Sequence, residues 1–86
     1  MDSEIFGWLI SELRLLKNKY KYLESVNATY DPINSCYIVY FNCNFCGDYF
    51  TIPVSIADGY VIDIHTIKNI ESAFIYYYNA YEKYFT

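Results

Sequence analysis

The chain has 86 residues, of which 55% are hydrophobic and 22% aromatic, and its net charge is −4. This length predicts one domain, and the hydrophobic content excludes a disordered chain. The acidic balance argues against direct binding to nucleic acid or to an anionic membrane, since both need a basic surface. No apolar run approaches the roughly 18 residues of a membrane span, and the acidic start does not favour a secretory signal. We therefore expect a cytoplasmic protein.

The first predicted element is a helix over residues 3 to about 24. Its apolar residues recur at steps of three and four, which is the period of one helical face. They are Ile5, Leu9, Leu13, Leu16, Tyr20 and Leu23. Residues 25–35 lack this period and contain the turn formers Asn27 and Asp31-Pro32, so a loop is expected there.

Three strands are predicted after this loop. Residues 36–41 form an almost continuous β-branched and aromatic run, which is typical of a covered strand. Residues 49–56 alternate with a period of two, which assigns every second side chain to the core. The inward set is Phe50, Ile52, Val54 and Ile56. The third strand is expected over residues 60–64.

Two turns are expected to join these strands. A Cys-rich turn over residues 43–48 connects the first pair. Asp58-Gly59 predicts a two-residue hairpin before the third strand, because both residues tolerate positive φ. Pro53 cannot donate a hydrogen bond to a ladder, so we expect a bulge or break there.

A second helix is predicted over residues 66–85, with Thr66 or His65 as its cap. Its buried face is expected to comprise Ile67, Ile70, Phe74, Tyr77 or Tyr78, Tyr81 and Phe85. The elements together predict an α+β fold with a single domain over residues 1–86. In it, a three-stranded antiparallel sheet is flanked in sequence by two helices packed on one face.

The motif Cys43-x-x-Cys46-Gly47, with Phe41 before it and Phe50 after it, resembles one knuckle of a zinc ribbon. Two thiolates on a tight turn can point at one tetrahedral zinc ion. A ribbon needs a second pair of ligands, however, and this resemblance supplies only the first.

Cys36 and His65 are the remaining soft ligands, and the predicted strands place both too far from Cys43 and Cys46 to complete a site in one chain. Two chains sharing zinc could complete it, so a zinc-stabilised or dimeric adaptor is one hypothesis. Otherwise the cysteines are ordinary small apolar residues. A redox role is disfavoured because the pair lies in a hairpin and not at a helix start. His65 is expected to cap a helix or face solvent, since no catalytic pattern accompanies it.

The interval from Tyr22 to Ile67 contains no Lys or Arg. Its acids are expected in loops, in turns or on the outward side of the sheet, where they predict an acidic surface for a basic partner. Twelve tyrosines exceed what one small core needs, so some should be exposed as contact residues. The predicted partner-binding residues are Glu24, Asp31, Asp48, Tyr49, Asp58, Tyr60 and Asp63. The alternative is a solvated acidic face without a function.

In size, charge and helix–sheet–helix layout, the chain resembles small phage-encoded anti-CRISPR proteins and bacterial toxin-immunity proteins. The resemblance covers the layout of the whole chain and includes no motif. It implies a small non-enzymatic inhibitor in the host cytoplasm that occupies the nucleic-acid-binding surface of a nuclease or similar effector, as a DNA mimic. No cofactor is expected for such a protein. A homodimer would cover apolar surface that a small aromatic-rich chain leaves exposed.

Overall fold

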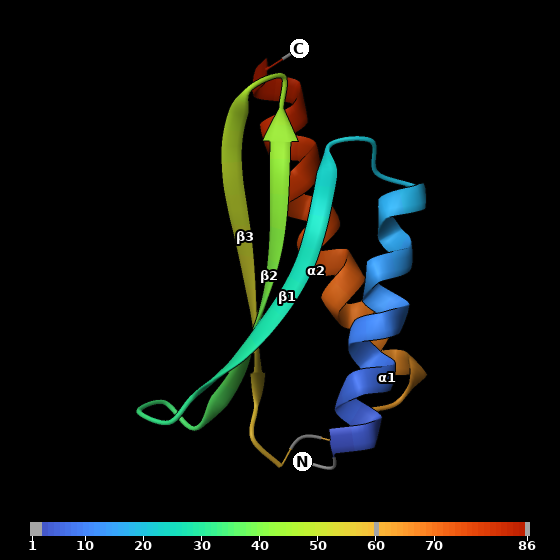
Figure 1. Cartoon of the computed structure of the whole chain (residues 1–86), viewed down its shortest axis with the longest axis vertical. Helices are drawn as coiled ribbons and strands as arrows, with labels where there is room; N and C mark the ends of the chain where they lie inside the picture. Colours follow the sequence, from blue (N-terminus) through green and yellow to red (C-terminus); the bar gives the residue numbers. More distant parts are fainter. Residues whose placement is uncertain (1–2, 60, 86) are drawn as a thin grey trace.

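The computed structural model describes residues 3–59 and 61–85, and within them one sheet is covered on one face by two helices (Figure 1). The elements in chain order are α1 (Ser3–Arg14), the 3₁₀ helix η1 (Leu15–Asn18), β1 (Leu23–Asp31), β2 (Cys36–Phe45), β3 (Asp48–Ala57) and α2 (Ile64–Phe85). The three strands are antiparallel in the order β1-β2-β3. The predicted α+β fold, with a three-stranded sheet and both helices on one face, is therefore confirmed.

The first strand lies where the sequence predicted the end of a helix and a loop. A β-bulge falls between Leu23 and Ser25, so the buried residues Leu23 and Val26 are three positions apart. A spacing of three imitates the helical period, and it hides the alternation of a strand. The predicted helix over residues 3–24 is therefore wrong beyond η1, and the predicted loop over 25–35 is wrong as far as Asp31, while residues 32–35 form a turn as expected.

The β2–β3 hairpin forms where the Cys-rich turn was predicted. Phe45 pairs with Asp48, and Cys46 and Gly47 between them have φ of 57° and 100°. Positive φ at both central residues is the signature of a type I′ turn, whose twist matches that of the flanking strands. The Asn44 side chain holds the turn, because its Oδ1 accepts a hydrogen bond from the Gly47 N–H at 2.7 Å.

No bulge or break occurs at Pro53, contrary to the prediction. Pro53 pairs with Tyr40 in an unbroken β2–β3 register. The Asp58 N–H donates to the Ser35 carbonyl, so it points toward β2. Because successive backbone N–H groups of a strand point to opposite sides, the Pro53 nitrogen points toward the free edge of β3. The missing N–H therefore costs the ladder nothing.

The third strand predicted over residues 60–64 is also wrong. Asp58-Gly59 does form a turn, with Gly59 at φ 85°, but the chain beyond it enters α2 instead of pairing with β3. The helix begins at a capping box. The Asp63 Oδ1 accepts a hydrogen bond from the Thr66 N–H at 3.1 Å, and the Thr66 Oγ1 accepts one from the Asp63 N–H at 3.1 Å. Asp63 is thus the cap, and not Thr66 or His65.

The core lies between the sheet and the helices. Alternate residues of each strand point into it, and the inward set predicted for β3 is buried or half-buried. The Phe41 ring of β2 stacks on the Phe74 ring of α2, with centroids 4.5 Å apart. None of the described helices is long and apolar enough to cross a membrane.

Candidate protein-binding surface

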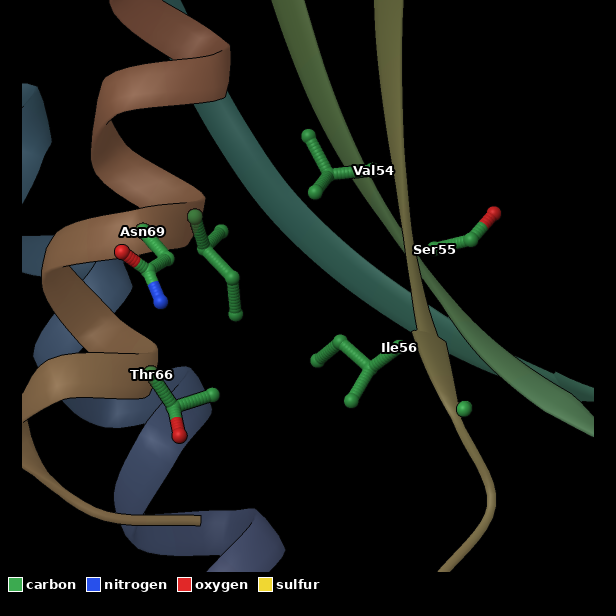
Figure 2. Close-up of a pocket in the computed structure, with 7 residues that line it drawn as sticks. Val54, Ser55, Ile56, Thr66 and Asn69 are labelled. Carbon is green, nitrogen blue, oxygen red and sulfur yellow. The ribbon is translucent and has the colours of Figure 1, made fainter. Parts of the chain in front are cut away.

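The strands turn a second set of side chains away from the helices, and we call this set the outer sheet face. Figure 2 shows the alternation on β3, where Val54 and Ile56 point toward α2 and Ser55 points away. The strand register extends the same alternation across the sheet. The outer sheet face comprises Glu24, Ser25, Asn27, Thr29, Asp31, Cys36, Ile38, Tyr40, Asn42, Asn44, Tyr49, Thr51, Pro53, Ser55 and Ala57.

Neutral polar side chains form a hydrogen-bonded row across this face. The Thr51 hydroxyl donates to the Asn42 Oδ1 at 3.0 Å, and the Asn42 Nδ2 donates to the Ser25 Oγ at 3.0 Å. One row thus links all three strands. Side chains fixed in this way lose little further conformational freedom when a partner binds.

The acids of the interval lie mainly at the two ends of the sheet. Glu24 and Asp48 lie at the end of the sheet that carries the β2–β3 turn. Asp48 is exposed there, and the Glu24 carboxylate accepts a hydrogen bond from the Asn44 Nδ2 at 3.0 Å. At the opposite end, Asp31 closes β1 and Asp58 follows β3. Glu24 and Asp31 are seven residues apart on β1, which is about 23 Å at the rise of a strand.

Hydrogen bonds fix the carboxylates of the second group. The Asp31 Oδ1 accepts from the Ile33 and Asn34 N–H groups, and its Oδ2 accepts from the Asn34 Nδ2 at 2.7 Å. These bonds, that from the Asn34 side chain above all, lower the pKa of Asp31, so it is charged at neutral pH. The Asp58 Oδ2 accepts from the Tyr30 hydroxyl at 3.0 Å.

Asp63 differs from the other acids, because it serves the fold as the cap of α2. Backbone hydrogen bonds, first from Thr66 and then from His65, lower its pKa. The five predicted acids therefore do not form one continuous patch. Glu24 and Asp48 lie at one end of the sheet, Asp31 and Asp58 at the other, and Asp63 at the helix start.

The cations lie outside the sheet. All six Lys and Arg precede Tyr22 or follow Ile67 in the sequence. The Lys19 Nζ pairs with Glu71 at 3.4 Å, and the Arg14 Nε donates to the Val26 carbonyl at 3.2 Å. The strands and the turns between them thus carry carboxylates and no cation, while the helices and the segment after η1 carry both signs.

Apart from Tyr30 on β1, which is 43% exposed, the exposed tyrosines of the described residues lie on two surfaces. Tyr49 is 73% exposed on the outer sheet face, as predicted, whereas Tyr60 lies outside the described residues. Tyr76, Tyr77 and Tyr84 are exposed on α2, and none of the three was predicted as a binding residue. A run of three tyrosines in a helix could have indicated this, because successive residues cannot all face one core.

The cysteines do not converge. Cys43 is 1% exposed on the core side of β2, and Cys46 is exposed in the turn. Burial foremost, and then the Glu24 charge, raises the pKa of the Cys43 thiol to about 11. Cys36 begins β2 and is half-buried. In residues 3–59 and 61–85, no three His, Cys, Asp or Glu side chains gather where they could hold a metal ion.

A hollow of about 310 Å³ lies between β3 and the start of α2 (Figure 2). Its lining includes Val54, Ile56, Thr66 and Asn69, and no ionisable side chain. General acid–base chemistry needs such a group beside the substrate, and the lining of this hollow does not supply one. Of the two positions predicted for His65, a helix cap or an exposed residue, the exposed one is confirmed: its side chain faces solvent and its N–H donates to the Asp63 Oδ1 at 2.9 Å.

Comparisons of the chain with protein-family models, curated proteins and solved structures find no match. The function is therefore inferred from the surface geometry and the charges described above.

Proposed function

We propose that this protein is a small non-enzymatic inhibitor that binds a basic nucleic-acid-processing protein through its outer sheet face. One observation carries the proposal: from Tyr22 to Ile67, an interval that contains the whole sheet, there are five carboxylates and no Lys or Arg. A field of one sign speeds encounter with an oppositely charged partner and disfavours acidic competitors.

The layout suggests how such a surface would bind. Tyr40 offers ring area near the middle of the face and Tyr49 offers it near the β2–β3 turn, one on each side of the fixed row of neutral polar groups. Carboxylates at both ends, about 23 Å apart, would meet separate cationic side chains of the partner. Surfaces that bind nucleic acid carry such rows of Lys and Arg, which neutralise phosphates. A protein docked there would exclude the nucleic acid.

A zinc-sharing adaptor is less favoured on chemical grounds. Zinc needs its thiolates to meet at one point, whereas Cys43 is buried on the core side of β2 and Cys46 is exposed in the turn. Binding would also require the core around Cys43 to open.

The experiment has two steps. The tagged full chain is used to capture proteins from its host, and a captured basic nucleic-acid-binding protein is then purified. Its affinity for nucleic acid is measured with increasing amounts of this chain. We expect competition, with the nucleic-acid affinity falling as the chain is added. A ternary complex with unchanged nucleic-acid affinity would contradict the inhibitor function.

A further inference from the structure

In the described residues, the outer edge of β1 presents backbone groups that no other strand pairs with. The Asn44 N–H donates to the Tyr22 carbonyl at 2.8 Å. The backbone N–H and C=O groups of the even-numbered residues of β2 therefore point toward β1. By alternation and register, Val26, Ala28 and Tyr30 then direct their N–H and C=O groups away from β2. The Arg14 Nε bond to the Val26 carbonyl agrees with this direction.

The two edges of the sheet are protected to different degrees. On β3, Pro53 lies in the middle of the free edge and withholds a donor, which discourages another strand from pairing there. β1 contains no Pro, Lys or Arg from Leu23 to Asp31. The lower part of the β1 backbone diverges from that of α1 (Figure 1).

The β1 edge can pair with itself. In an antiparallel pairing about Ala28, the two alanines lie opposite each other, and Val26 of each copy lies opposite Tyr30 of the other. Ala28 is small enough for close approach at the centre. The Tyr30 ring, which is 43% exposed in the single chain, would lie against the β1 edge of the second copy at Val26, whose own side chain is buried in its core. The Val26 carbonyl has two lone pairs, so it can accept from Arg14 and from the added strand.

Charges match in the same register. Asp31 of one copy falls opposite Ser25 of the other. Ser25 borders a hollow of about 410 Å³ that Arg14 and Lys17 also line, together with Val26 and Asn27. The acidic end of one edge thus meets the basic end of the other, and the two-fold symmetry of the dimer repeats this contact at both ends of the interface.

We propose that two copies of this chain form a symmetric dimer by antiparallel pairing of their β1 edges about Ala28. A second copy is the favoured occupant, because each β1 edge has cations near one end and a carboxylate at the other. Antiparallel pairing of two copies brings these opposite charges together. The two three-stranded sheets join into one, and both outer sheet faces lie on the same side. The dimer is independent of any partner protein, so it can be tested without one.

The test is sedimentation of the full chain at 5–500 µM, a range on the order of common dissociation constants for small dimers. We expect a 20.4 kDa species, twice the 10.2 kDa of one chain. Ala28→Pro removes the central outward donor, and Arg14→Glu sets carboxylates against Asp31. Each should raise the dissociation constant of the dimer at least about tenfold, with an unchanged circular dichroism spectrum.

Matched controls make the result decisive. Ser55→Pro removes an outward donor from the β3 edge, and Lys68→Glu makes the same charge change on α2; both should remain dimeric. A wild-type chain that stays monomeric at the highest concentration would overturn the proposal. So would a dimer that persists in folded Arg14→Glu, or one that Ser55→Pro abolishes.

Discussion

Tyr78 places its hydroxyl at the margin of the core, where the Tyr22 N–H donates to it at 3.2 Å. The ring packs edge-on against Tyr20 and is tilted against Phe74 and Phe45. Burial is the main reason that the pKa of Tyr78 rises from 10.0 to about 12, and burial likewise raises the pKa of Cys43 from 9.0 to about 11. Both groups are therefore held neutral in the fold at pH values at which the unfolded chain ionises.

These shifts give stability a defined dependence on alkaline pH. A group whose pKa is raised by folding makes its full contribution to stability below the pKa that it has in the unfolded chain. This contribution is lost as the pH rises through the pKa of the folded state. We therefore expect the urea midpoint to fall steadily from about pH 9 to about pH 12. Tyr78→Phe should flatten the fall above pH 10 and lower stability at pH 7 by about 1 kcal/mol, because the Tyr22 N–H loses its acceptor. An unchanged alkaline slope in Tyr78→Phe would contradict this role.

The elements show where sequence patterns suffice and where they fail. The β2–β3 hairpin, the inward set of β3 and the last helix follow from alternation, a tight turn and a helical period. β1 was missed because Leu23 continues the helical spacing of Leu16 and Tyr20, and because the bulge after Leu23 hides the alternation of the strand. The false third strand followed Asp58-Gly59, a turn that serves equally well before a helix. The Asp63-x-x-Thr66 capping box was the available signal.

The binding surface was predictable only in its charge. The absence of Lys and Arg from the sheet can be counted in the sequence. The division of the acids between two ends, however, depends on which strands pair. With β1 unrecognised, Glu24 and Asp31 could not be placed at opposite ends of one strand.

The type I′ turn leads to a prediction at the scale of the hairpin. Cys46 adopts φ 57°, a conformation that Asn accepts more readily than Cys. Cys46→Asn should therefore stabilise the fold by about 0.5 kcal/mol, measured as a higher urea midpoint with a chelator present. The same rise should occur with equimolar zinc in place of the chelator. If zinc instead stabilises the wild type and Cys46→Asn abolishes that effect, the cysteines have a metal-binding role.

At the scale of the whole molecule, charge is distributed unevenly over the two layers. The helical layer and the segment after η1 supply all six cations, of which Lys19 pairs with Glu71, while the strands and the turns between them carry only carboxylates. A net charge of −4 therefore understates the field over the outer sheet face. The location of a charge, more than the total, should decide how a substitution affects binding.

The most direct measurement compares two variants with the same charge change. Glu24→Lys changes an exposed residue of β1 on the outer sheet face, and Glu12→Lys makes the same change on α1. Affinity for the captured partner is measured by calorimetry at low and high salt. We expect Glu24→Lys to weaken binding about tenfold or more at low salt and less at high salt, with Glu12→Lys close to wild type. Equal affinities for wild type and Glu24→Lys, or equal losses in the two variants, would contradict binding through the outer sheet face.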